Sequence, residues 1–213
     1  MEDNREGYYK STFENIYKHQ IWNNGDPNIP LSGPGSSFEN TEEYSNILNN
    51  FIYDNECKSV LDLGCGDLTW IPKTQFFNDN GIKYTGVDIV ESLITSHLTT
   101  FPEKQFLCKD ITIYNDFDEV DVIIIRDVIF HLKNDDILSI FANIKHKFKF
   151  LTITNCKNNV NTDKFNRWHF DEKNILIKPF NRLPNFLIKI EEPVFNRNSL
   201  IYSHNSFYDT LSR

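Results

Sequence analysis

The stretch Val60-Leu61-Asp62-Leu63-Gly64-Cys65-Gly66-Asp67-Leu68-Thr69-Trp70 decides the fold, because a short apolar run leads directly into two glycines at alternate positions. This pattern predicts a buried strand, a tight turn and a helix, so a nucleotide-like ligand can lie against bare backbone at the helix N-terminus. A dinucleotide site would require a third glycine where Thr69 stands. Asp62 and Asp67 lie on either side of the glycines, where they would repel a pyrophosphate and attract a cation. The segment therefore favours a cofactor that carries positive charge.

Short apolar segments alternate with helical segments along the rest of the chain. Strands are expected at 59–63, 84–88, 105–108, 120–126 and 150–154, and helices at 70–77, 91–98 and 134–146. This alternation is typical of a parallel sheet covered by helices on both faces. Two last strands, at 187–194 and 200–203, are close enough along the chain to form an antiparallel pair.

The N-terminal part has a different pattern. Apolar residues at helical spacing from Tyr9 to Tyr17 predict a helix over 8–20, and the capping-box spacing of Ser36-Ser37-Phe38-Glu39 predicts a second helix that ends near Asn55. Between them, residues 22–36 are rich in Gly, Pro and Asn and are expected to form a structured loop or a lid. We therefore expect N-terminal helices and a Gly/Pro loop over the ligand site (1–56), followed by the main domain as one globular unit (57–213).

The composition excludes several classes of protein. The 213 residues contain no apolar run near the ~20 residues needed to span a bilayer. The first seven residues are polar and acidic, unlike a secretory signal, so a cytoplasmic protein without a membrane partner is expected. The 4 cysteines have wide, irregular spacing, which indicates free thiols rather than a zinc or redox site.

The net charge of −8 is unevenly distributed. Residues 1–100 carry 15 acidic and 6 basic side chains, a net of −9, whereas residues 145–213 carry 6 acidic and 12 basic ones, a net of +6. One interpretation is that these are ordinary solvated faces. The other is that the basic C-terminal third forms one wall of a site for an anionic molecule.

The segment from Asp62 to Asp67 resembles the first-strand motif of class I S-adenosylmethionine-dependent methyltransferases. The resemblance implies a Rossmann-like, seven-stranded methyltransferase sheet of the α/β class, mostly parallel with the last strand antiparallel, preceded by N-terminal helices. It also implies that Asp88 binds the ribose hydroxyls, that Asp110 and Ile111 hold the adenine, and that 126–131 line the methyl-transfer site.

The N-terminal loop extends this resemblance. Trp22 with Ser32-Gly33-Pro34-Gly35-Ser36 is similar to the N-terminal region of a bacterial and viral subgroup of these enzymes. We expect the loop to receive the carboxylate of the methionine moiety through backbone N–H groups and two hydroxyls. The predicted S-adenosylmethionine-binding residues are Trp22, Ser36, Asp62, Gly64, Cys65, Gly66, Asp67, Trp70, Asp88, Ile89, Lys109, Asp110, Ile111 and Arg126.

Two residues after the fourth strand are candidates for catalysis. Methyl transfer to a hydroxyl requires a base, and His131 lies four residues after Asp127, on the same face if a helix starts there. Either residue is a candidate base, with Asp127 orienting His131; the alternative is that Asp127 caps the helix. A divalent ion would need a third ligand that is not evident nearby, so no metal site is predicted. Arg126 is expected to bind an anionic acceptor or to pair with Asp110.

The predicted function is O-methylation of a small polar acceptor, such as a sugar, a nucleotide sugar or a glycan precursor. Methylation of RNA or a protein side chain is an alternative, although the net charge of −8 argues against a nucleic-acid partner. A cofactor-fold binding subunit without catalysis is another. A dehydrogenase is disfavoured by Thr69 and the paired acids.

Overall fold

The protein is built on one twisted sheet of seven strands. The computed structural model describes residues 7–209, so the acidic start of the chain at 1–6 lies outside the described residues. The strands are β1 (Ser59–Leu63), β2 (Lys83–Asp88), β3 (Gln105–Cys108), β4 (Val120–Ile125), β5 (Phe148–Cys156), β6 (Ile188–Glu192) and β7 (Arg197–Ser203), in the order β3-β2-β1-β4-β5-β7-β6. The first five are parallel, and β7 runs antiparallel to both β5 and β6. The predicted Rossmann-like architecture with an antiparallel last strand is confirmed.

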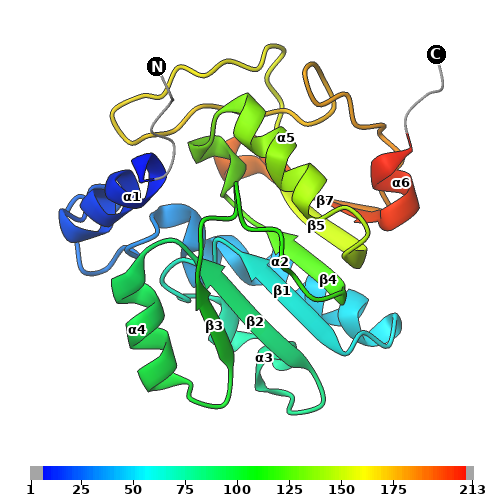
Figure 1. Cartoon of the computed structure of the whole chain (residues 1–213), viewed down its shortest axis with the longest axis horizontal. Helices are drawn as coiled ribbons and strands as arrows, with labels where there is room; N and C mark the ends of the chain where they lie inside the picture. Colours follow the sequence, from blue (N-terminus) through cyan, green and yellow to red (C-terminus); the bar gives the residue numbers. More distant parts are fainter. Residues whose placement is uncertain (1–6, 210–213) are drawn as a thin grey trace.

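Helices cover both faces of the sheet. They are α1 (Tyr8–Lys18), α2 (Phe38–Asp54), α3 (Gln75–Asn78), α4 (Glu91–Thr100), α5 (Asn134–Asn143) and α6 (His204–Tyr208), with 3-10 turns at Pro34–Ser36, Ile71–Lys73, Ile129–His131 and Pro193–Phe195. In Figure 1, α5 lies in front of the sheet and α2 and α3 lie behind it. No helix within residues 7–209 is long and apolar enough to cross a membrane.

The strands divide their apolar residues between two cores because successive side chains point to opposite faces. In β1, Leu61 and Leu63 pack in the core that includes α5 and α6, whereas Val60 packs in the core beneath α2 and α3. Ile123 and Ile124 of β4 divide in the same way. The buried parallel sheet holds its strand ends rigidly, and these ends carry the site.

The N-terminal helices contribute to both of these cores. Tyr9 of α1 belongs to the first core and Tyr44 of α2 to the second. The helix α1 lies over one end of the sheet beside the irregular segment 157–187, drawn yellow to orange in Figure 1. The division of the chain at residue 56 stays a prediction, since residues on both sides of it build the same cores.

Three local predictions differ from the structure. The expected helix at 70–77 is interrupted, because Thr74 is extended (φ −83°, ψ 150°) between a 3-10 turn and α3. The N-cap of α2 is Ser37, whose Oγ accepts from Asn40 N at 3.4 Å, while Ser36 belongs to the preceding turn. The segment after β4 forms only a 3-10 turn at Ile129–His131, because Asp127 adopts a left-handed conformation with φ 59°.

Candidate active site

A cavity lies where the carboxyl ends of β1, β2, β3 and β4 meet beneath α1 and the N-terminal loop. It encloses about 890 Å³ of space not filled by atoms, a volume that includes its open mouth. All of the predicted cofactor-binding and catalytic residues line it. The structure thus brings these residues together, as expected for a parallel sheet whose strand ends share one edge.

The turn after β1 allows a ligand to approach the backbone. Gly64 (φ 82°) and Gly66 (φ 59°) are in the left-handed region, which favours glycine. A Cβ added to Gly64 would lie 2.4 Å from Val128 Cγ2, and one added to Gly66 would lie 2.5 Å from Ser32 Oγ. The N–H groups of Gly64 and Cys65 both donate to Val87 O, which fixes the turn against β2. Any side chain at either glycine would therefore displace a part of the cavity wall.

Two buried carboxylates face this cavity. Asp62 is 4% exposed and accepts a hydrogen bond from Tyr84 Oη at 2.8 Å; Asp88 is 8% exposed and accepts from Gly66 N and Val90 N. Burial raises the pKa of Asp62 to about 7, against the opposite effect of the Tyr84 hydrogen bond. Burial also raises the pKa of Asp88. Burial makes the charged form of both carboxylates less stable. A ligand that supplies positive charge and hydrogen-bond donors would stabilise that form, so the two carboxylates are suited to such a ligand.

The third acidic residue, Asp67, has a different role. Its Oδ2 accepts from Ser32 N at 2.9 Å, while Ser32 Oγ accepts from Asp67 N at 3.0 Å. Tyr17 of α1 forms a hydrogen bond with the same Ser32 hydroxyl at 2.7 Å. These bonds join the N-terminal loop and α1 to the glycine turn, so Asp67 helps to close the cavity.

The loop after β3 forms the opposite end of the cavity. Ile89 and Ile111 line it with apolar surface, and Asp110 Oδ1 accepts from both the N–H and the hydroxyl of Thr112. Lys109 N donates to Asp88 O, and its ammonium lies 5.2 Å from the centre of the Tyr114 ring. An apolar slot bordered by a carboxylate fits a flat ring with an amino group.

The Ser-Gly-Pro-Gly-Ser loop is organised differently from the prediction. The N–H groups of Gly33, Ser36 and Ser37 donate to carbonyls within the loop itself, to Pro30 O, Gly33 O and Pro34 O. The Ser32 hydroxyl is engaged with Asp67 and Tyr17, whereas Ser36 is buried and lines the cavity together with Trp70. The loop therefore offers the Ser36 hydroxyl to a ligand rather than a row of free N–H groups.

Arg126 belongs to a buried cluster of four charges. It donates to Asp127 Oδ2 and to Glu192 Oε2, both at 2.9 Å, and Arg197 of β7 pairs with the same two carboxylates at 2.9 Å. Arg126 also donates to Gly35 O at 3.0 Å, which ties the N-terminal loop to the end of β4. The expected pair with Asp110 is not formed, because the carboxylate partners of Arg126 come from the adjacent residue and from β6.

Asp127 does not orient His131. Its carboxylate is engaged by two arginines, and its backbone N donates to Thr154 Oγ1 at 3.1 Å. His131 Nδ1 instead lies 2.6 Å from His169 O, in the segment that follows β5. A carbonyl can only accept, so Nδ1 carries the proton and Nε2 is the unprotonated nitrogen. Burial lowers the pKa of His131 to about 4, against the opposite effects of this hydrogen bond and of Asp127, so the imidazole is neutral near pH 7.

Aromatic residues cover the cavity beside His131. The Trp22 ring lies 4.6 Å from the imidazole centre, and Phe13 and Phe170 lie edge-on at 6.2 and 6.0 Å. Trp22 Nε1 donates to Trp168 O at 2.7 Å, so the 166–170 turn is held over the site from two sides. His131 therefore lies where an aromatic wall meets the polar part of the cavity.

Several lining residues were absent from the predicted set: Tyr9, Phe13, Tyr17, Ser32, Thr112, Val128 and Leu132. The three aromatic residues recur every four positions in α1, a spacing that predicted an apolar face for docking but not what this face would cover. Within residues 7–209, no group of three or more His, Cys, Asp or Glu side chains is placed to hold a metal ion.

The comparisons with known proteins agree with this geometry. Residues 39–184 match a family model described as a methyltransferase domain. The chain belongs to this methyltransferase family. The predicted enzyme class, a methyltransferase, is therefore confirmed. No curated protein matches the chain by sequence.

Solved methyltransferases share the fold at low sequence identity. Magnesium protoporphyrin IX methyltransferase from Synechocystis, with bound S-adenosylmethionine, has a TM-score of 0.62 at 12% identity and covers 93% of this chain and 98% of its own. The 1,6-didemethyltoxoflavin-N1-methyltransferase from Burkholderia thailandensis has a TM-score of 0.62 at 16% identity, over 92% of this chain and 86% of its own. An S-adenosylmethionine-dependent methyltransferase from Clostridium acetobutylicum has a TM-score of 0.54 at 16% identity, over 91% and 98%. These likenesses extend over most of each chain and concern the fold.

Proposed function

We propose that this methyltransferase transfers the methyl group of S-adenosylmethionine to a hydroxyl of a small polar acceptor, with His131 as the base. The observation that carries the proposal is a neutral imidazole whose Nδ1–H is held by His169 O, on a residue that lines the cavity. The positions of the two buried carboxylates and the glycine turn support the cofactor half. The bacterial and viral subgroup suggested by the N-terminal loop stays a prediction.

The cavity residues fit the cofactor in charge and in shape. S-adenosylmethionine supplies an electrophilic methyl group on a sulfonium and carries an ammonium at the same end. In this proposal Asp62 faces the cationic end, Asp88 accepts from the ribose hydroxyls, and Ile89 and Ile111 enclose the adenine beside Asp110. Gly64 and Gly66 leave room that a Cβ would fill.

His131 would take the proton of the acceptor hydroxyl through Nε2. A base must be unprotonated at the working pH and within hydrogen-bond reach of the proton that it removes. The hydrogen bond from Nδ1 to His169 O sets the tautomer that leaves Nε2 free to accept. Trp22 and Phe13 would exclude water on one side of the acceptor.

The class of acceptor that we propose is broader than the class that the sequence suggested. The idea of a nucleotide sugar relied on the basic C-terminal third as an anionic wall. In the structure Lys149, Lys157, Lys173, Lys189 and Arg197 from that third are engaged in ion pairs. Five of the twelve basic residues of that third are thus paired with carboxylates. Sugars or glycans remain one candidate among hydroxyl-bearing small molecules.

Isotope-labelled methyl transfer tests the proposal. The wild-type chain is expected to label an acceptor in a panel of phenols, sugars and nucleotide sugars, and His131→Gln is expected to lower the rate about 100-fold because the proton is no longer removed. The control is His19→Gln, on an exposed histidine outside the cavity. Labelling of RNA alone, with steep salt dependence, would instead support the nucleic-acid alternative. Binding of the cofactor with no labelling of any acceptor would support a non-catalytic subunit.

Cofactor affinity is expected to depend on pH through Asp62. Because the pKa of Asp62 is raised to about 7, its carboxyl group is largely neutral at pH 5.5 and charged at pH 7.5. The affinity for S-adenosylhomocysteine, which retains the ammonium, should fall by up to about tenfold per pH unit below that pKa. Isothermal titration across this range measures the effect, and Asp62→Asn should give a flatter profile. A wild-type profile as flat as that of the variant would mean that Asp62 does not face the cationic end of the cofactor.

The same ionisation has the opposite effect on the stability of the unliganded chain. A folded-state pKa above the unfolded value means that the native state binds more protons between about pH 4 and 7, so stability falls as pH rises through this window. Between pH 5.5 and 7.5, the melting temperature of wild type should therefore decrease more steeply than that of Asp62→Asn, as measured by thermal unfolding.

A further inference from the structure

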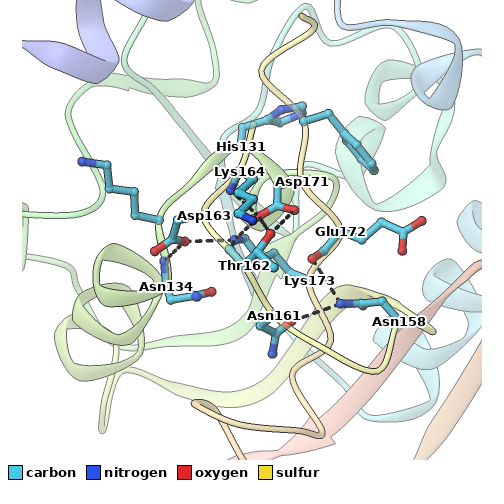
Figure 2. A network of polar contacts seen from close by, with 12 residues as sticks. His131, Asn134, Asn158, Asn161, Thr162, Asp163, Lys164, Asp171, Glu172 and Lys173 are labelled. Carbon is cyan, nitrogen blue, oxygen red and sulfur yellow. Dashed lines mark hydrogen bonds and ion pairs between the residues drawn. The ribbon is translucent and has the colours of Figure 1, made fainter. Parts of the chain in front are cut away.

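A fully buried lysine lies in the segment between β5 and β6. The Lys173 side chain is 0% exposed, and its ammonium pairs with Asp171 Oδ2 at 2.9 Å and Asp163 Oδ1 at 3.1 Å and also donates to Thr162 O. Figure 2 shows these groups converging on Lys173 below His131. Burying an ammonium carries a large desolvation cost unless it is paired and hydrogen-bonded, and three oxygens meet that condition here.

The two aspartates of this lysine cluster (Lys173, Asp163 and Asp171) form hydrogen bonds to residues on both sides of His131. Asp163 Oδ1 also accepts from Asn134 N at 2.8 Å, at the start of α5. Asp171 N donates to Phe130 O at 2.8 Å. The lysine cluster therefore connects the irregular segment to Phe130, directly before His131, and to Asn134, three residues after it.

The turn that faces His131 lies between the members of the cluster in sequence. Asn166 closes this turn, since its Oδ1 accepts from the N–H groups of Trp168 and Phe170. The turn presents His169 O to His131 Nδ1 and Trp168 O to Trp22 Nε1. A second path runs through side chains, because the Lys173 ammonium lies 5.6 Å from the Phe165 ring centre and that ring stacks on His169 at 4.3 Å.

We propose that Lys173 is a positioning residue that holds His169 O against His131 Nδ1 and so sets the tautomer of the base. The segment 157–187 has almost no regular secondary structure, so strand or helix hydrogen bonds do not fix the place of this carbonyl. The ion pairs of Lys173 supply that constraint instead. The inference rests on the proposed function, in which His131 Nε2 accepts the proton.

The tautomer of His131 can be measured without an acceptor. In uniformly ¹⁵N-labelled full-length chain, long-range ¹H–¹⁵N spectra distinguish a protonated Nδ1 from a protonated Nε2. Wild type should show protonated Nδ1. Lys173→Met, which keeps an apolar chain of similar length, should shift the tautomer ratio about fivefold toward protonated Nε2. A change of this size corresponds to the loss of one hydrogen bond of ordinary strength. Titration of S-adenosylhomocysteine should give an unchanged dissociation constant, because Lys173 is not a cavity residue.

Two further variants keep the test decisive. Lys164→Met, on an exposed lysine in the same segment, is the matched control and should leave the His131 signals unchanged. Asp171→Asn weakens the cluster without removing the lysine, and it should shift the tautomer ratio in the same direction. This variant serves as the test if Lys173→Met does not fold. His131 could also respond to the charges near it, Asp127 and Arg197, which these variants leave in place.

The outcomes separate this inference from the proposed function. Suppose that wild type has a protonated Nδ1 and that folded Lys173→Met and Asp171→Asn keep the same tautomer ratio. This result would overturn the role of Lys173 while leaving His131 as the base. Protonated Nε2 in wild type would overturn both, since the base would then lack its free nitrogen. A tautomer shift together with lost S-adenosylhomocysteine binding would indicate a general structural role and would also overturn the inference.

Discussion

Asp88→Ala should lower the affinity for S-adenosylhomocysteine about 100-fold, because two hydrogen bonds to a charged acceptor would be lost. The carboxylate is buried at the end of β2 and lines the cavity. It also accepts from Gly66 N at 2.9 Å and Val90 N at 3.0 Å, so Asp88→Ala should also loosen the glycine turn. Isothermal titration at pH 7.5 measures the effect directly.

A matched control separates the site from a general effect of removing an aspartate. Asp79 also accepts a backbone hydrogen bond, from Gly81 N at 2.7 Å, but it is only partly buried and lies outside the cavity. Asp79→Ala should leave the dissociation constant within about twofold of wild type, as is usual for surface substitutions. An Asp88→Ala protein that folds and binds with wild-type affinity would contradict the assignment of Asp88 to the ribose.

Gly66→Ala should abolish measurable binding and destabilise the fold by about 1–3 kcal/mol. The added Cβ would lie 2.5 Å from Ser32 Oγ and 3.2 Å from Tyr17 Oη, at a residue with φ 59°. Ser32 cannot move away without breaking its hydrogen bonds to Asp67 and Tyr17, so the N-terminal loop and α1 would be displaced with it. Chemical denaturation and titration of S-adenosylhomocysteine together measure both effects.

A second substitution identifies the cause of this loss. Ser32→Ala removes the oxygen that the new Cβ would meet, so Gly66→Ala should destabilise the fold less in a Ser32→Ala background than in wild type. Gly81→Ala, on an exposed glycine whose Cβ would meet only the Asp79 side chain, should change stability little. Destabilisation that Ser32→Ala does not reduce would mean that backbone strain at φ 59°, not the contact with Ser32, is the cause.

Much of the cavity could be predicted because its residues follow strands. Asp62, Asp88 and Arg126 each lie at or next to the carboxyl end of a predicted strand, and parallel strands bring such ends to one edge. The positions of strands along the chain and their apolar pattern are short-range properties of the sequence, so the strand ends can be deduced without knowing side-chain contacts. The two glycines after β1 were equally informative, since their positive φ angles belong to the turn itself.

The uneven distribution of charge along the chain predicted only part of the site. The acidic N-terminal part does contain Asp62 and Asp88, which face the cavity. In the basic C-terminal third, however, Arg197 pairs with Asp127 and Glu192, and Lys173 pairs with Asp163 and Asp171, so these two cations are already bound to carboxylates. A count of charges along the chain cannot show which of them neutralise one another.

The sequence by itself determined the sheet, the glycine turn and the set of strand-end residues that line the cavity, because these depend on local periodicity and on the geometry of parallel strands. Only the tertiary structure decided which groups pair there. Asp127 binds Arg197, 70 positions further along the chain, and His131 binds the carbonyl of His169, 38 positions away. The physical reason is that these contacts depend on the path of an irregular segment, where no repeating pattern of residues encodes which atoms will meet.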